Sequence, residues 1–402
     1  MNSRNAAAVL AGFTLVSTPA SADWPACGRV DSFPAREWKA ADPSRYGWDE
    51  SRLAAAKTIF EGQASAAVMV VHRGRLIAEW GANGDRYTAQ SVRKGLVSSL
   101  VGQLVASRKL DLGATLEEMG IDDVEPPLTA GERKATLRDL LRSRSGIFHS
   151  ALYEVGGWTR DRKALAEEER AAGYDLYPPG AYWIYNNWDF NAVGTIVERA
   201  AGEEIGPLFE RRIAKPTRMQ DFNAADVEYT TSDHPAEKRF GNVSSHRAYV
   251  FNISTRDLAR YGLLYLNCGK WGGKEVVPKS WVLESIVGPD TREGRLEGRK
   301  KTGFGDYGYL WQIDRPGARR FIGLKTREPN YIASGNRGHL LMVFPYLDLV
   351  IAHQVATVGG VSMEAQMKRA TEGSPEVADE QIERLFAAII LAHPGGQTAF
   401  EE

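Results

Sequence analysis

The 402-residue sequence predicts an α+β fold in which one sheet is built from both ends of the chain. Apolar, β-rich runs occur early, at 66–81, and again late, between 307 and 355. The long stretch between them is dominated by segments with helical spacing and capping residues. We therefore expect sheet-forming parts at about 45–90 and 305–395, with a mostly helical part, about 91–304, inserted between them.

The clearest local feature is a β-hairpin in AAVMVVHRGRLIAEWG at 66–81, where Arg73-Gly74 supplies the tight turn. Later apolar runs predict strands at 307–313, 339–345 and 347–355. Helical spacing, in several places with a Ser or Thr start and a Gly end, predicts helices at 49–63, 91–110, 136–146, 191–202, 254–269, 279–288 and 377–393.

The first 22 residues differ in composition from the rest of the chain. Arg4 lies in a short polar start, the apolar run AAAVLAGFTLVS follows, and Ala20-Ser21-Ala22 has the form that signal peptidase accepts. We expect a secretory signal at 1–22 and an N-terminal segment at 23–44, and the alternative is a buried N-terminal helix. The mature protein is then periplasmic or secreted. No run of 18 uninterrupted apolar residues predicts a membrane span.

The charge balance favours a small-molecule or peptide-sized substrate. There are 50 Lys and Arg against 51 Asp and Glu, so no basic excess points to a nucleic-acid partner. The seven histidines are scattered and no HExxH or CxxC occurs, so we expect no zinc site and no cofactor. In an oxidising compartment Cys27 and Cys268 are able to form one disulfide, although the sequence leaves open whether they approach each other.

Three short motifs are candidates for chemistry, and the first is Ser91-Val92-Arg93-Lys94. Ser91 opens a predicted helix and Lys94 follows one turn later on the same face. A serine at this position is close to free backbone N–H groups, and a desolvated lysine is able to take its hydroxyl proton. The alternative is a helix cap beside a solvated lysine.

The second motif is Tyr185-Asn186-Asn187, after a Pro-Gly loop and before a helix. A tyrosine beside a cation can pass a proton to a leaving group, and an asparagine amide can bind both a lysine and a substrate carbonyl. The third is Ser334-Gly335-Asn336, just before a strand, where glycine lets a backbone N–H approach a ligand. Taken singly, the alternatives are an aromatic packing cluster and a hairpin turn.

In this order the motifs resemble those of the penicillin-recognising serine hydrolases, which include class C β-lactamases, D,D-peptidases and related esterases and amidases. Flanking segments such as TLRDLLRSRSGI and GHLLMVFPYLDLVI are also similar, and the likeness covers roughly residues 45–390. It implies a β-lactamase/D,D-peptidase-like fold, with an antiparallel sheet flanked by helices. No GxSxG motif supports an α/β-hydrolase fold.

The resemblance implies a role for each motif. Ser91 would be the acylated nucleophile and Lys94 its base. Tyr185 would assist proton transfer, and Asn187 would orient Lys94 and the substrate. The backbone N–H groups of Ser91 and Asn336, the latter following Gly335, would form the oxyanion hole.

The third motif departs from the family pattern. When Gly335 is aligned with the last residue of K-T-G, Ala333 takes the lysine position and Ser334 the threonine position. In β-lactamases and D,D-peptidases that lysine holds the substrate carboxylate, which alanine cannot do. The same change is found in the esterase and 6-aminohexanoate-dimer-hydrolase-like branches of the family, and YNNWDFN, with Trp188, is most similar to the second of these.

Five side chains are weaker candidates for substrate contact: His149, Tyr153, Trp188, Ser334 and His339. Core packing is an alternative for the histidines. The favoured function is an exported serine hydrolase that cleaves a carboxylic ester or amide through an acyl-enzyme. The alternatives are a β-lactamase or D,D-peptidase, and a non-catalytic binding protein on the same fold.

Overall fold

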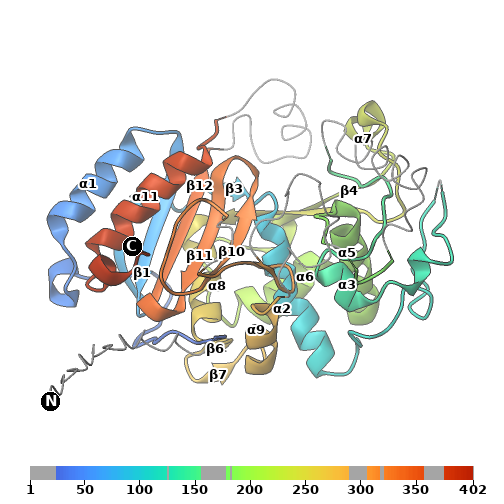
Figure 1. Cartoon of the computed structure of the whole chain (residues 1–402), viewed down its shortest axis with the longest axis horizontal. Helices are drawn as coiled ribbons and strands as arrows, with labels where there is room; N and C mark the ends of the chain where they lie inside the picture. The colour runs from blue at the N-terminus through green and yellow to red at the C-terminus, as the bar shows by residue number, and fades with distance from the viewer. Residues whose placement is uncertain are drawn as a thin grey trace, which may run out of the picture.

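The computed structural model describes residues 24–124, 126–154, 178–181, 183–288, 306–316, 321–356 and 375–401. Its centre is a seven-stranded antiparallel sheet with the order β2-β1-β12-β11-β10-β9-β8 (Figure 1). Strands from the two ends of the chain therefore pair directly, since β1 lies beside β12. This confirms the predicted α+β class and the antiparallel sheet. The predicted signal at 1–22 lies outside the described residues.

The strands of this sheet are β1 (Ser65–His72), β2 (Arg75–Gly81), β8 (Asp306–Tyr307), β9 (Gln312–Asp314), β10 (Asn330–Gly335), β11 (His339–Phe344) and β12 (Leu349–Val355). A second sheet has the order β3-β5-β4, from β3 (Arg86–Thr88), β4 (Val227–Thr230) and β5 (Ala248–Ser254). The short pair is β6 (Lys270–Trp271) and β7 (Lys274–Glu275).

The α-helices are α1 (Glu50–Glu61), α2 (Val92–Ala106), α3 (Leu137–Leu141), α5 (Asn187–Ala201), α6 (Ile205–Phe209), α7 (Pro235–Phe240), α8 (Thr255–Leu266), α9 (Lys279–Ser285) and α11 (Asp379–Ala392). In Figure 1, α1 and α11 lie together on one face of the main sheet, and α8 and α2 lie behind the other. In the same view α3, α5, α6 and α7 gather beyond α2, away from α1 and α11, whereas α9 packs against α2.

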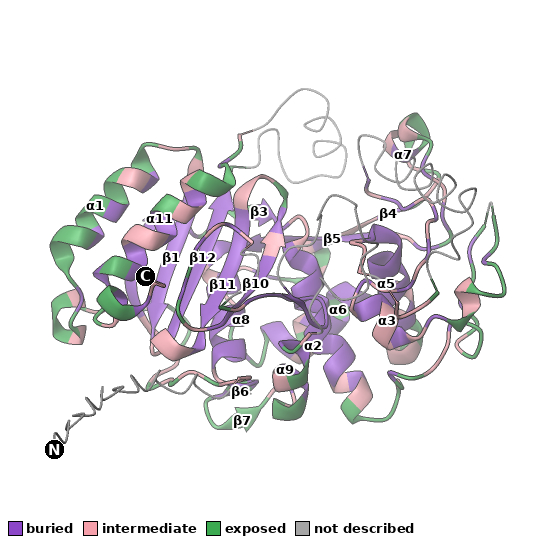
Figure 2. Ribbon diagram, in the orientation of Figure 1, coloured by how far each residue is buried: buried purple, intermediate pink, exposed green. Residues whose placement is uncertain are grey.

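Each face of the main sheet is covered by helices, so its strands are apolar on both sides. In β1, Val68 and Val70 join the core shared with α1 and α11, whereas Met69 and Val71 join the core shared with α2 and α8. Alternate side chains of a strand point to opposite faces. The uninterrupted apolar run in β1 therefore reflects a sheet buried on both faces, which Figure 2 shows as continuous buried strands.

The predicted hairpin at 66–81 is present, and its turn residues Arg73 and Gly74 have φ of 52° and 80°. Residues 307–313 do not form the single strand that we expected. Leu310 adopts φ of 67° and its N–H donates to Leu141 O, so the segment turns between β8 and β9. β4 and β5 lie within the part of the chain that we expected to be mostly helical, and β5 pairs with β3 from the expected sheet-forming part.

The N-terminal segment is attached to the body of the fold. Cys27 and Cys268 are joined by a disulfide, with their Cα atoms 5.5 Å apart. The backbone N–H of Gly28 also donates to Leu266 O at 2.9 Å. Through these contacts the segment ahead of α1 is held against the end of α8. Among the described residues, no helix combines the length and apolar character needed to cross a membrane.

Candidate active site

Ser91 lies at the N-terminus of α2, the helix that runs through the middle of the molecule. Gln90 before it has φ of 50°, which turns the chain sharply out of β3 and into the helix. Ala89 N–H donates to Phe251 O at 2.8 Å, so β5 fixes the start of this turn. Ser91 precedes the first helical residue and makes no side-chain capping bond. The alternative interpretation of the motif required the Ser91 hydroxyl to cap the helix. The structure shows no such bond.

Lys94 is buried one turn further along α2, with 2% of its surface exposed. Its Nζ donates to Ser91 Oγ at 2.8 Å and to Asn187 Oδ1 at 2.8 Å, and it also contacts the hydroxyl of Tyr185. The Phe190 ring lies 4.4 Å from the same nitrogen. A buried lysine amine needs hydrogen-bond partners, and these three oxygens supply them. The first two motifs, far apart in sequence, therefore meet at one amine.

The turn after α3 holds Tyr185 and Asn187 in place. Ser143, with φ of 54°, accepts from Ile184 N–H at 2.9 Å through its carbonyl oxygen, and Asn186 N–H donates to its Oγ at 3.0 Å. Asn186 Oδ1 then caps α5 by accepting from Trp188 N–H at 3.1 Å. Since α5 begins at Asn187, this cap fixes the side chain that faces Lys94.

The third motif lies against the nucleophile loop. A β-carbon built at Gly335 would lie 2.6 Å from Ala89 O and 2.9 Å from Gln90 Cβ, so only glycine fits there. β9 pairs with β10 only as far as Ile332, so the last three residues of β10 have no partner in β9. Asn336, which follows, is exposed. The end of β10 therefore lies close to the loop that leads into the N-terminus of α2.

Ala333 faces α2 and not an open cleft. It belongs to the core on the α2 side of the sheet and is 3% exposed. A β-carbon built at Gly95 would lie 3.0 Å from the Ala333 β-carbon and 3.5 Å from the Trp311 ring. The close approach of α2 fills the space that a longer side chain at 333 would need.

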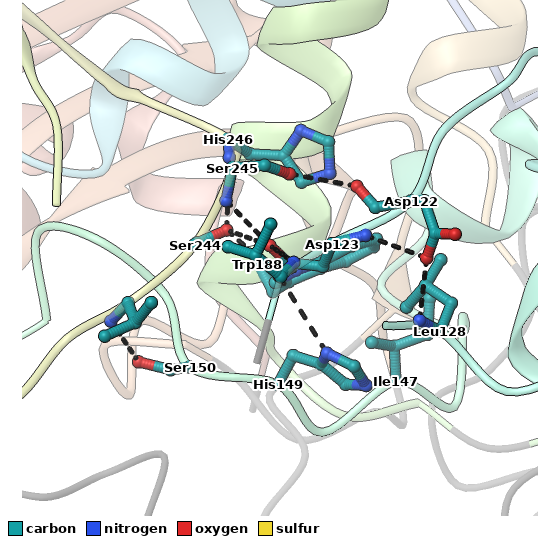
Figure 3. A network of polar contacts seen from close by, with 12 residues as sticks. Asp122, Asp123, Leu128, Ile147, His149, Ser150, Trp188, Ser244, Ser245 and His246 are labelled. Carbon is teal, nitrogen blue, oxygen red and sulfur yellow. Dashed lines mark hydrogen bonds and ion pairs between the residues drawn. The ribbon is translucent and has the colours of Figure 1, made fainter. Parts of the chain in front are cut away.

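Two of the weaker candidates, His149 and Trp188, belong to a second buried cluster around Asp123 (Figure 3). Trp188 is fully buried, and its indole N–H donates to Asp123, as does Ser244 Oγ at 3.0 Å. His149 Nδ1 lies 3.9 Å from Asp123 Oδ2, and its Nε2 lies 3.4 Å from Glu132 Oε1. The Trp188 ring is therefore not an exposed wall for a substrate.

This second cluster shifts the pKa values of its own groups. Burial acts to raise the pKa of Glu132, but hydrogen bonds from His149 and Thr129 outweigh it, and the pKa is lowered overall. Burial lowers the pKa of His246, which packs edge-on against Trp188, to about 4. His246 is therefore neutral near pH 7. The cluster as a whole joins segments from four parts of the chain.

Tyr153 and His339, two of the other predicted contact residues, lie next to residues that contact or form the loop before Ser91. Tyr153 has φ of 65°, and its hydroxyl donates to Gln90 Oε1 at 3.0 Å. His339 is buried opposite Gly335 at the start of β11. Ser334 is half-buried opposite Leu340, which belongs to the core on the α1 and α11 side of the sheet.

One residue of the site, Glu154, was not predicted from the sequence. It is buried and accepts from Asn187 Nδ2 at 2.9 Å. A single glutamate in a loop has no recognisable pattern. Its neighbour Tyr153 is a predicted contact residue because it follows the Ser-Gly turn together with His149, and no spacing rule links that segment to Asn187.

Comparisons with known proteins agree with this arrangement. Residues 55–371 match the family model described as Beta-lactamase. Esterase EstB from Burkholderia gladioli is 26% identical over 220 residues, which make up 46% of this chain and 55% of the esterase.

Two solved structures show the same fold. A candidate 6-aminohexanoate-dimer hydrolase from Bacillus anthracis has a TM-score of 0.58 at 18% identity, over 92% of this chain and 90% of that one. A penicillin-binding protein homologue from Caulobacter crescentus has a TM-score of 0.52 at 16% identity, over 76% of this chain and 91% of that one. With the family model covering most of its length, the chain belongs to the Beta-lactamase family.

Proposed function

We propose that this protein is an exported hydrolase that cleaves a carboxylic ester or amide through an acyl-enzyme on Ser91. One observation carries the proposal: the buried Lys94 amine contacts Ser91 Oγ, Tyr185 and Asn187 at the same time. A serine hydroxyl becomes a useful nucleophile when a base lies within hydrogen-bond reach and a third group orients that base. Lys94 and Asn187 meet both conditions.

The reaction proceeds in two steps. The Ser91 oxygen attacks the substrate carbonyl carbon while its proton passes to Lys94, which acts as the base. The carbon–oxygen or carbon–nitrogen bond of the substrate then breaks, and the leaving alcohol or amine takes up that proton through Tyr185, which contacts Lys94. Water next attacks the ester on Ser91, giving a carboxylic acid and returning a proton to the serine oxygen.

The oxyanion of each tetrahedral intermediate is stabilised by backbone N–H groups. Ser91 contributes one at the N-terminus of α2, where helix N–H groups have no partner within the helix. Asn336, directly after the close contact at Gly335, contributes the other. Each such donor contributes about 3 kcal/mol to lowering the barrier.

A substrate without an essential carboxylate fits the site better than a penicillin does. Ala333 replaces the lysine that binds the carboxylate in β-lactamases, and its surroundings are filled by Gly95 and Trp311. The chain is also similar to an esterase and, in fold, to a candidate 6-aminohexanoate-dimer hydrolase. We therefore favour small esters, amides or short peptide-like compounds as substrates.

Ser91→Ala tests the proposal. Hydrolysis of a short-chain p-nitrophenyl ester should fall to background while the circular dichroism spectrum and melting temperature stay unchanged. Lys94→Ala should cost nearly as much activity, because the two groups act as a unit. Full turnover by Ser91→Ala would exclude Ser91 as the nucleophile.

The alternatives have their own readouts. Rapid hydrolysis of nitrocefin, or stable labelling by a fluorescent penicillin, would favour a β-lactamase or D,D-peptidase. Failure of a fluorophosphonate probe to label the folded protein would favour a binding protein. Export is tested by N-terminal sequencing of the secreted or periplasmic protein, which should begin at Asp23 if cleavage follows Ala22.

A further inference from the structure

Lys94, Asn187 and Glu154 form a chain of buried hydrogen bonds that ends in a carboxylate. Lys94 Nζ donates to Asn187 Oδ1 at 2.8 Å, and Asn187 Nδ2 donates to Glu154 Oε1 at 2.9 Å. Asn187 is 8% exposed and Glu154 is 6% exposed. The amide of Asn187 therefore links Glu154 to Lys94.

The carboxylate decides which way the Asn187 amide points. The oxygen and nitrogen ends of an asparagine amide have nearly the same shape, so packing alone does not fix their orientation. The Glu154 oxygen that faces Asn187 accepts a hydrogen bond, so it selects the NH2 end of the amide. The opposite orientation would place Oδ1 against Glu154 and the NH2 group against Lys94, leaving buried polar groups without partners.

The segment that carries Glu154 is itself fixed to α7. Asn242 Nδ2 donates to the backbone oxygen of Glu154 at 2.8 Å and to Glu237 Oε2 at 2.8 Å. Tyr153 N–H donates to Glu237 Oε1 at 2.8 Å. Burial raises the pKa of Glu237, which is completely enclosed. The backbone on both sides of the Tyr153–Glu154 peptide is therefore held by one buried group of side chains.

We propose that Glu154 is a positioning residue for the reaction: it orients the Asn187 amide so that Lys94 donates one N–H to Oδ1. The remaining hydrogen-bonding capacity of the amine is then directed at Ser91 and Tyr185, the two groups that exchange protons with it. This inference rests on the proposed function, since it assigns Glu154 to the same acylation step. It concerns an acceptor for the Asn187 amide and not a contact with substrate.

Two substitutions distinguish the role of Glu154 as a hydrogen-bond acceptor from the space that its side chain fills. Glu154→Gln keeps an oxygen that can accept from Asn187, whereas Glu154→Leu has similar size and accepts nothing. With a p-nitrophenyl ester, we expect Glu154→Leu to lower kcat at least tenfold with KM within about twofold, because the proton-transfer step is affected and binding is not. Glu154→Gln should remain within about threefold of the wild-type kcat.

A second pair of the same chemistry provides the control. Asn252 Nδ2 donates to Glu228 Oε1 at 2.9 Å between β5 and β4, and Asn252 Oδ1 accepts from Thr88 Oγ1 at 3.1 Å. Glu228→Leu breaks an equivalent Asn–Glu bond that does not lead to Lys94. It should leave kcat within about twofold of the wild type.

The rate of labelling by a fluorophosphonate probe reports on Ser91 directly and should follow the order wild type, Glu154→Gln, Glu154→Leu. The inference is overturned if Glu154→Leu labels as fast as the wild type, if Glu154→Gln is as slow as Glu154→Leu, or if Glu228→Leu loses as much. If the wild-type protein itself neither turns over esters nor labels at Ser91, the proposed function fails and the inference fails with it.

Discussion

Replacing Gly335 by alanine tests whether the end of β10 lies against the loop that carries Ser91. The added β-carbon would lie 2.6 Å from Ala89 O, 2.9 Å from Gln90 Cβ and 3.1 Å from His339 Cβ. Gly335 has φ of −126° and ψ of 149°, a conformation that alanine adopts without strain. The whole effect of the substitution therefore comes from these contacts.

The size of the effect follows from the shortest contact. Moving from 2.6 Å to an ordinary contact of 3.4 Å requires β10 and the loop before Ser91 to separate by about 0.8 Å. Overpacking of this kind costs about 1–3 kcal/mol of stability. A displacement near 1 Å in an active site costs on the order of 100-fold in rate. We expect a kcat loss between about 10-fold and 100-fold, with a melting temperature only a few degrees lower.

Steady-state kinetics with a p-nitrophenyl ester and a thermal melt measure the two effects separately. Gly131→Ala is the matched control, because Gly131 has φ of −71° and the nearest atom to an added β-carbon, Thr129 Oγ1, is 3.9 Å away. It should leave both quantities unchanged. Wild-type kcat in a folded Gly335→Ala protein would refute the close contact between β10 and the nucleophile loop.

Three further predictions concern binding and stability. Ala333→Lys should lower the melting temperature and create no penicillin labelling, because a β-carbon at Gly95 would lie only 3.0 Å from that of Ala333; labelling of a stable variant would contradict this. Breaking the disulfide by Cys268→Ser, which opens a sequence separation of 241, should cost about 2–5 kcal/mol in urea unfolding, and an unchanged midpoint would contradict it. Acid should also destabilise the fold, because burial lowers the pKa of four histidines to about 4, or about 3 for the last: His72, His246, His353 and His393. Their folded-state pKa values lie below the unfolded value of about 6.5, so their contribution is fully present above pH 6.5 and is lost as the pH falls towards 4. Equal unfolding free energies at pH 7 and pH 4.5 would contradict this.

Local patterns in the sequence predicted the parts of the fold that depend on local rules. The hairpin at 66–81 was predictable because Arg73-Gly74 can adopt positive φ between two apolar runs. The turn at Leu310 was not, because its φ of 67° goes with a bond from its N–H to Leu141 O, far away in sequence. The sequence predicted one sheet built from both ends of the chain, but no local pattern predicted the order of its strands.

The same distinction holds at the site. Ser91 and Lys94 were visible because an i, i+3 spacing on a helix places them together without help from the rest of the chain. Trp188 was misleading, since it follows Asn187 in sequence but points to Asp123 in the interior. Glu154 was invisible because its only relation to Asn187 is a contact formed by folding. A partner of this kind can be identified only from the folded structure.

Mass spectrometry of the intact protein after exposure to a panel of small esters, amides and β-lactams tests the central claim most directly. The account predicts an acyl adduct on the peptide that contains Ser91, formed with at least one ester or amide and absent from Ser91→Ala. An adduct on another residue, or turnover of the same compound by Ser91→Ala, would contradict it.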